Sequence, residues 1–335
     1  MQTFSQRVLA WFEKYGRKHL PWQQQATLYK TWVSEVMLQQ TQVKTVIPYF
    51  NRFMRRFPDI LTLANASQDD VLAHWAGLGY YSRARNLHKS AQIIRDQYHG
   101  LFPNNIEDVT ALPGIGRSTA AAILALTLNQ RHAILDGNVK RVLSRHQLID
   151  GRPNRSATLK KQWAVAEKLT PQRACGQYTQ AMMDLGSLIC TRSKPKCREC
   201  PVYVDCGAYQ SNCIDDYPNK QPKKTLPEKN TTMLIITDDQ RIYLEKRPSK
   251  GIWGGLWSLP EVSGTTIACF LKRLGLSEDD RQPLDTYTHT FTHYKLHIQP
   301  LIIRVNHLNT GFRQTEVKQL GLPKPVQHLI SNLHY

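Results

Sequence analysis

The sequence predicts a mainly α-helical N-terminal domain followed by a smaller α/β domain. From Phe4 to about Asn212, apolar residues recur at three- and four-residue steps, the period of an amphipathic helix. The stretch 215–230 is rich in proline and lysine and poor in apolar residues, as linkers are. Beyond it, apolar and polar residues alternate, which is typical of strands. We therefore expect domains at 1–214 and 231–335, a division that a length of 335 residues allows.

The first domain shows individual helices. The range 31–46 is expected to form one, and the proline at position 48 suits the start of the next. Ser67 is a plausible N-cap of a further helix. The apolar stripe of the first example is made by Val33, Val36, Met37, Gln40 and Val43.

Two segments of the second domain have the alternation of strands. Met233–Ile236 and Ile242–Lys246 are expected to flank a short turn, and Tyr287–Ile303 is expected to be extended. Within the last segment, Tyr294 and Leu296 alternate with polar neighbours, so one face of this strand should be buried.

The chain carries a large excess of positive charge. Lys and Arg total 44 against 26 Asp and Glu, a formal net charge of +18. Such a surplus favours a polyanionic partner, because basic side chains that neutralise phosphates release counterions. From charge alone, a ribosome-associated protein or a merely solvated basic surface remains the alternative.

The sequence predicts neither a membrane span nor a secretory signal. No apolar run approaches the ~20 residues that a membrane-spanning helix needs. Charged residues such as Arg7 and Glu13 interrupt the N-terminal segment. We expect a cytoplasmic protein, associated with the nucleoid in a bacterium, whose seven cysteines stay reduced.

Four cysteines cluster near the end of the first domain. Cys190, Cys197, Cys200 and Cys206 follow the pattern C-x6-C-x2-C-x5-C. Closely spaced thiols in a reducing compartment more often bind metal than form disulfides. Thiolate ligands alone do not exclude a structural zinc ion.

A glycine-containing turn at 112–120 precedes an alanine-rich helix. Gly114 and Gly116 would let the backbone approach a ligand closely, and the helix start would offer free N–H groups. Together they suit a DNA phosphate. A plain turn between two helices is the alternative, because such turns often contain glycine.

Two carboxylate residues have sequence neighbours that suit a proton donor in one case and a fixed negative charge in the other. Asp136 stands before a helix that starts at about Gly137, so it is expected to be an N-cap and to stay ionised. Glu35 shares one helical face with Gln39 and Gln42 but has apolar neighbours, and partial burial would raise its pKa. Cleavage of an N-glycosidic bond needs this pair, because one group protonates the departing base and the other stabilises the sugar cation.

Six motifs between residues 20 and 210 resemble those of the MutY family of adenine DNA glycosylases, which belongs to the endonuclease III or helix–hairpin–helix superfamily. They are LPW at 20–22, SEVMLQQTQV at 34–43, GLGYYSRARN at 77–86, LPGIGRST at 112–119, LDGNVKRVL at 135–143 and the cysteine loop at 190–206. The resemblance implies a monomeric repair enzyme that hydrolyses adenine from A:8-oxoguanine or A:G mispairs in double-stranded DNA. It also implies that the four cysteines hold a 4Fe–4S cluster.

The resemblance implies a role for several single residues. Glu35 would protonate adenine at N7, and Asp136 would stabilise the sugar cation with support from Asn138. Gln39 and Tyr80 would wedge into the duplex near the lesion, after the target base has left the stack. Gln180 would contact the flipped adenine.

Position 118 separates this family from its lyase relatives. Endonuclease III carries a nucleophilic lysine two residues after the second hairpin glycine, whereas this chain has Ser118. A serine cannot form a Schiff base with the sugar, so we expect a monofunctional enzyme. The alternatives are a glycosylase with lyase activity, with Lys140 as a slow nucleophile, and a catalytically silent DNA-binding protein.

The segment 231–335 resembles the Nudix-like domain of the same family. The helix expected near Phe270 lacks the carboxylate pairs that a Nudix hydrolase uses to bind magnesium, so we expect recognition rather than hydrolysis. Phe291, Thr292 and His293 match a Phe-Ser-His loop that reads 8-oxoguanine. Thr292 keeps the hydroxyl of that serine but adds a methyl group.

Overall fold

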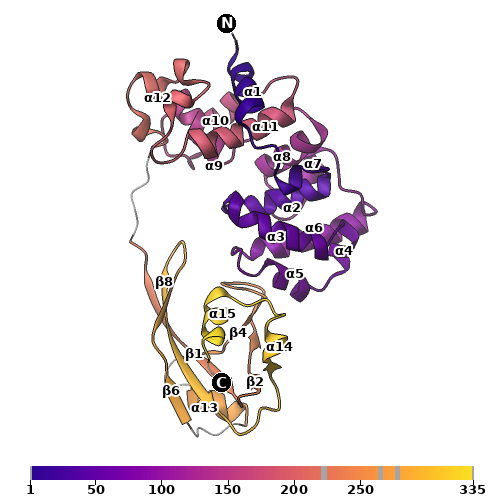
Figure 1. Ribbon diagram of the computed structural model, residues 1–335, viewed down its shortest axis with the longest axis vertical. Helices are drawn as coiled ribbons and strands as arrows, with labels where there is room; N and C mark the ends of the chain where they lie inside the picture. The colour runs from indigo at the N-terminus through magenta and orange to yellow at the C-terminus, as the bar shows by residue number, and fades with distance from the viewer. Residues whose placement is uncertain (1, 220–224, 263–266, 276–279, 334–335) are drawn as a thin grey trace. The chain divides into compact units, whose positions relative to one another are not determined.

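The computed structural model describes residues 2–219, 225–262, 267–275 and 280–333. Its contacts divide the chain into two compact units (Figure 1). The first comprises residues 1–64 and 89–222, and the second comprises residues 65–88 and 223–335. The segment 65–88, which the sequence places in the helical domain, thus clusters with the C-terminal part of the chain.

The first unit is built from helices that bury apolar side chains between them. The largest fully buried side chains include Trp32, Phe53 and Leu143. Its helices are α1 (Phe4–Tyr15), α2 (Leu28–Leu38), α3 (Val43–Arg56), α7 (Ile106–Ala111), α8 (Arg117–Leu128), α9 (Gly137–His146), α10 (Ser156–Leu169), α11 (Cys175–Asp184) and α12 (Gly207–Gln210). A boundary between the two units falls inside α4 (Ile60–Asn65) and another inside α6 (Ser82–Gln97). Helix α5 (Gln68–Trp75) belongs to the second unit.

The helix expected over 31–46 is interrupted, so that prediction is wrong. Helix α2 ends at Leu38, Gln40 adopts a left-handed backbone with φ 60°, and α3 begins at Val43. Pro48 lies inside α3 and does not start it. The apolar period continues across the break, and for that reason periodicity did not reveal it.

Two predicted helix starts are confirmed. The Ser67 hydroxyl accepts a hydrogen bond from the backbone N–H of Asp70 at 3.2 Å. Asp136 caps α9 by accepting from the backbone N–H of Val139 at 2.8 Å. Each cap satisfies a backbone donor that has no partner within its helix.

The second unit contains a seven-stranded sheet with the order β6-β8-β1-β2-β9, in which β5 also pairs with β1 and β7 with β8. Strands β1 and β8 run parallel over ten residues each, from the pair Glu228 and Lys295 to the pair Thr237 and Arg304. The strands are β1 (Glu228–Thr237), β2 (Arg241–Ile242), β3 (Glu245–Lys246), β4 (Trp257–Ser258), β5 (Glu261–Val262), β6 (Asp280–Pro283), β7 (Tyr287–Thr290), β8 (Lys295–Arg304) and β9 (Phe312–Arg313). The helices are α13 (Ile267–Arg273), α14 (Gln314–Val317) and α15 (Lys324–Ser331).

The expected strands of this unit are present, with changed boundaries. Strand β1 begins at Glu228, inside the stretch expected to be a linker, because residues 228–230 pair with β8. The extended segment 287–303 is divided by a turn at 291–294 into β7 and β8.

Within the described residues, no helix has both the length and the apolar character that a bilayer crossing requires.

Candidate functional site

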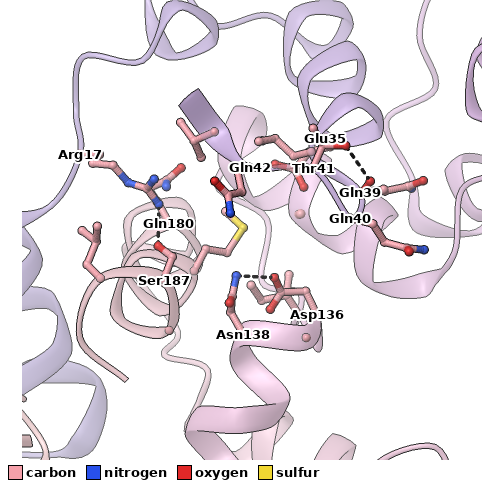
Figure 2. Close-up of a pocket in the computed structure, with 18 of the residues that line it drawn as sticks. Arg17, Glu35, Gln39, Gln40, Thr41, Gln42, Asp136, Asn138, Gln180 and Ser187 are labelled. Carbon is pink, nitrogen blue, oxygen red and sulfur yellow. Dashed lines mark hydrogen bonds between the residues drawn. The ribbon is translucent and has the colours of Figure 1, made fainter. Parts of the chain in front are cut away.

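A cavity of ≈ 1080 Å³ opens among the helices of the first unit. Its walls come from α2 and the turn that follows it, the start of α8, the start of α9, α11, and the π-helical turn Leu185–Ile189 (Figure 2). The predicted site residues that line it are Glu35, Gln39, Ser118, Asp136, Asn138 and Gln180. Four separate parts of the sequence therefore meet at one space.

Glu35 lies near the C-terminal end of α2. Its neighbours Trp32 and Val36 are buried, and Glu35 itself is half-buried where it lines the cavity. Burial raises the pKa of Glu35 to about 8, and the negative charge of Asp136 is a smaller cause in the same direction. At neutral pH Glu35 therefore carries a proton that it can give to a bound molecule.

Asp136 is held by the start of α9. Besides the bond from Val139, it accepts a hydrogen bond from the Asn138 side-chain amide at 3.3 Å (Figure 2). Burial raises the pKa of Asp136, while the hydrogen bonds from Val139 and Asn138 and the charge of Arg141 act in the opposite direction. The site thus places a protonated acid and a hydrogen-bonded carboxyl group on one cavity.

Arg141 joins this carboxyl group to the segment that carries the cysteines. Its Nη2 donates to the Asn138 side-chain oxygen at 2.9 Å and to the Gly186 carbonyl at 2.6 Å. Its Nε donates to the Cys190 carbonyl at 2.7 Å. A Cβ at Gly186 would lie 2.5 Å from the Cβ of Asn138, so glycine alone permits this approach.

A buried carboxylate that the sequence analysis missed lies at the end of α11. The Asp184 side chain has no exposed surface and forms an ion pair with Arg17 at 2.6 Å. Arg17 also donates to the Ser187 hydroxyl at 2.9 Å (Figure 2). One signal in the sequence could have revealed this site: Asp184 stands among the apolar residues Met182, Met183 and Leu185. An acidic residue in an apolar run is buried only when it has a partner, so a partner was to be expected.

The glycine turn has the geometry expected of the end of a hairpin. Gly114 has φ 78°, and Gly116 is the N-cap of α8 without a side-chain hydrogen bond to the first turn. Neither glycine lines the cavity among the described residues. Ser118 lines it, and its hydroxyl accepts a hydrogen bond from the backbone N–H of Leu135 at 2.9 Å.

The four clustered cysteines line a separate small cavity of ≈ 30 Å³. Burial raises the pKa of the Cys200 thiol to about 12, and charge on the three other thiols adds to this shift. Arg145 donates to Cys190 Sγ at 3.5 Å. In the part of the chain that the structure describes, no three His, Cys, Asp or Glu side chains are placed so that they could hold a metal ion.

The remaining predicted residues lie in the second unit. Tyr80 is 41% exposed and has φ 47°, with the Arg83 guanidinium 5.4 Å from its ring centre. Phe291, Thr292 and His293 form the turn between β7 and β8. The Phe291 ring lies 5.2 Å from that of Trp253 and 4.7 Å from that of Tyr294, between ring centres.

Two family models match the chain, one in each part. Residues 33–168 match the HhH-GPD superfamily of base excision DNA repair proteins, and residues 231–332 match the NUDIX domain. An adenine DNA glycosylase of Buchnera aphidicola is 43% identical, over 98% of this chain and 97% of that protein. The human adenine DNA glycosylase is 31% identical, over 89% of this chain and 66% of its own length.

Solved structures agree with the helical part. A thermostable thymine-DNA glycosylase is 26% identical with a TM-score of 0.57, over 62% of this chain and 95% of that one. An endonuclease III trapped on DNA has a TM-score of 0.54 over 62% of this chain and 94% of its own, at 19% identity. The second comparison supports the fold alone.

Proposed function

Because the chain belongs to the adenine DNA glycosylase family of base excision repair enzymes, we propose that it hydrolyses adenine from mispairs with 8-oxoguanine or guanine, using Glu35 and Asp136. The observation that carries this proposal is the pairing of these two carboxyl groups on one cavity, with Glu35 protonated at neutral pH. The extruded adenine and its sugar would enter this cavity.

Glu35 acts as the general acid in this mechanism. It gives its proton to N7 of adenine while the bond between C1′ and N9 breaks, so the electron pair of that bond leaves with the base. Water then supplies the hydroxyl group that joins C1′, and its proton returns to the Glu35 carboxylate. Glu35 thus ends the reaction protonated.

Asp136 and Asn138 act on the sugar. Positive charge develops at C1′ as the base leaves, and an ionised Asp136 stabilises it electrostatically. The bonds from Val139 and Asn138 hold the carboxylate in one orientation, so it needs no rearrangement during the reaction. A Glu35 that keeps its proton also removes the charge repulsion that would disfavour this ionised form.

We propose a monofunctional enzyme because position 118 offers no amine. The Ser118 hydroxyl is engaged by Leu135 and cannot form a Schiff base. Lys140 is not among the described residues that line the cavity. A strand break should therefore need later treatment with alkali.

The partner base would be read by the turn at 291–293. Phe291 packs in tilted and edge-to-face arrangements with the rings of Trp253, His289 and Tyr294, and this aromatic group would contact a base. The Thr292 hydroxyl and His293 Nδ1 lie 3.4 Å apart and can both form hydrogen bonds. Gln39 and Tyr80 are proposed to support the opened duplex.

The four clustered cysteines suit a 4Fe–4S cluster. All four line one cavity, and cysteine thiolates are the ligands that such clusters take. The cluster would stabilise the loop from Cys190 to Cys206. Arg145 holds this loop by donating to the Thr191 and Arg192 carbonyls at 2.7 Å and 3.3 Å.

The deciding experiment offers duplexes with A opposite 8-oxoguanine, A opposite G, or an oxidised thymine, and treats half of each sample with alkali. We expect adenine release from the first two and strand breaks mainly after alkali. Attack on oxidised thymine with direct nicking would instead indicate a lyase. Binding without base loss would indicate a silent DNA-binding protein.

A further inference from the structure

Gln180 and Asp184 stand one helical turn apart on α11, and Gln180 lines the cavity that contains Glu35. We infer that Asp184 is a positioning residue that determines base specificity. It sets which end of the Gln180 amide faces the cavity, so that the site accepts a purine with an amino group at C6 and disfavours one with an oxygen there. This inference rests on the proposed function.

The hydrogen bonds around Asp184 leave the Gln180 amide one orientation. Asp184 Oδ2 accepts from the backbone N–H of Arg17 at 2.7 Å. Its Oδ1 accepts from Arg17 Nη2 at 2.6 Å, Arg17 Nε at 3.0 Å and Gln180 Nε2 at 2.9 Å. A carboxylate that is ion-paired with a guanidinium only accepts hydrogen bonds, so Gln180 must turn its NH2 group toward it.

The other end of the amide is therefore available to a bound base. Within the described parts of the chain, no group donates to Gln180 Oε1. Gln180 as a whole residue is only 8% exposed, and the surface it keeps includes part of the cavity wall. A free amide could rotate by half a turn and exchange its donor for its acceptor, but the bond to Asp184 opposes that rotation.

An acceptor at this place distinguishes two purines of nearly the same shape. Adenine carries an amino group at C6, which donates to an amide oxygen. Hypoxanthine carries an oxygen at C6, which would face Oε1 without a hydrogen between them. A buried polar site rejects a ligand that leaves its groups unpaired.

The substitution Asp184→Asn tests this arrangement directly. Donors meet both carboxylate oxygens, so an amide at 184 must place its NH2 against a donor on one side or the other. The constraint on Gln180 is then weakened. The readout is the rate of adenine release divided by that of hypoxanthine release, opposite the same partner base. This ratio is measured on one folded population, so it is insensitive to the amount of protein that folds.

We expect Asp184→Asn to lower this ratio about tenfold, the effect of one lost hydrogen bond in a buried site. In a Gln180→Met background, which has no amide to orient, the same substitution should not change the ratio further. The control is Asp96→Asn, the same change at a carboxylate that is ion-paired with Arg95 and does not line the cavity. It should leave the ratio at the wild-type value.

An unchanged ratio in Asp184→Asn, with both rates reduced alike, would show that Asp184 is only structural and would overturn the inference. If that variant does not fold, the wild-type protein still decides by NMR. The Gln180 side-chain NH2 signals, identified by their loss in Gln180→Met, should exchange slowly with water, and rapid exchange would overturn the inference. A wild-type protein that releases no adenine would instead refute the proposed function.

Discussion

Glu35 shows how a single side chain acquires its chemistry from its surroundings. The same residue type on the exposed face of α2 would be ionised at neutral pH. Here its position beside Trp32 and Val36 and near Asp136 raises its pKa to about 8. The sequence supported this shift because apolar residues surround Glu35 in the chain, whereas its proximity to Asp136 depends on tertiary packing such as that of α2 against α8.

Glu35→Gln should reduce the single-turnover rate of adenine release by a factor of about 10²–10⁴, the usual contribution of a general acid. Glutamine has nearly the same shape but gives no proton. Affinity for the mispaired duplex, measured by fluorescence anisotropy, should stay within a few-fold of wild type. Release at a rate near that of wild type would show that another group protonates the base.

The rate should also depend on pH in a way that identifies this acid. Adenine release is expected to fall as the pH rises through about 8, because Glu35 then loses its proton. Single-turnover rates between pH 6 and 9.5 test this. A rate that keeps rising above pH 8.5 would contradict the assignment.

The raised pKa of Glu35 also predicts the pH dependence of stability. The unfolded chain loses this proton near the ordinary value of 4.5 and the folded chain near 8, so the folded state binds more protons between them. The contribution of Glu35 is therefore complete below pH 4.5 and is lost as the pH rises to 8. Denaturant unfolding should show that Glu35→Gln gains stability relative to wild type over this range, on the order of a few kcal/mol.

At the scale of elements, helix starts were predictable and one helix end was not. Ser67 and Asp136 indicate where their helices start, because a short polar side chain at the N-cap can accept a hydrogen bond from the first turn. The end of α2 depends instead on the left-handed backbone of Gln40. No residue type in that stretch demands this conformation, so the hydrophobic period alone predicted one continuous helix. Asp184 and Arg17 were also missed, because their pairing joins positions far apart in sequence.

The turn before α8 offers a matched pair of substitutions. Gly114 has φ 78°, so Gly114→Ala should strain the backbone and lower stability by about 1 kcal/mol. A Cβ at Gly116 would meet nothing within 4 Å, so Gly116→Ala should lower stability less, by on the order of 0.5 kcal/mol, because alanine is the poorer N-cap. Its methyl group would still occupy space next to the free N–H groups of the helix start.

Gly116→Ala is therefore expected to weaken DNA binding about tenfold if a phosphate binds at those N–H groups. Thermal unfolding and anisotropy measurements on the two variants separate the effects. Unchanged affinity in Gly116→Ala would place the phosphate contact elsewhere.

At the scale of the whole molecule, composition predicted two parts but not their membership. The change from helical to alternating periodicity predicted that strands follow the helices. The grouping of residues 65–88 with the C-terminal part depends on tertiary contacts, such as the 2.6 Å ion pair between Lys246 and Asp69. Neither charge stands out in the sequence, since each belongs to an ordinary polar stretch.

The cysteine loop gives a prediction for the entire helical unit. Cys200→Ser should remove the absorption band at ~400 nm that a 4Fe–4S cluster gives and lower the thermal transition by on the order of 10 °C. The control is Cys269→Ser, at an exposed thiol of the other unit, which should change neither. A zinc signal by mass spectrometry with no visible band in the wild-type protein would contradict the cluster.

The clearance between α9 and the turn at Leu185–Ile189 is set by a residue that has no side chain. Gly186 lies so close to Asn138 that one methyl group would force the two segments apart. Asn138 bonds to Asp136, and the same turn directly follows the helix that carries Gln180 and Asp184. The absence of a side chain at Gly186 therefore sets the distance between the part of the pocket that would act on the sugar and the part that would contact the base. Bulk added at this point would damage catalysis and base selection together.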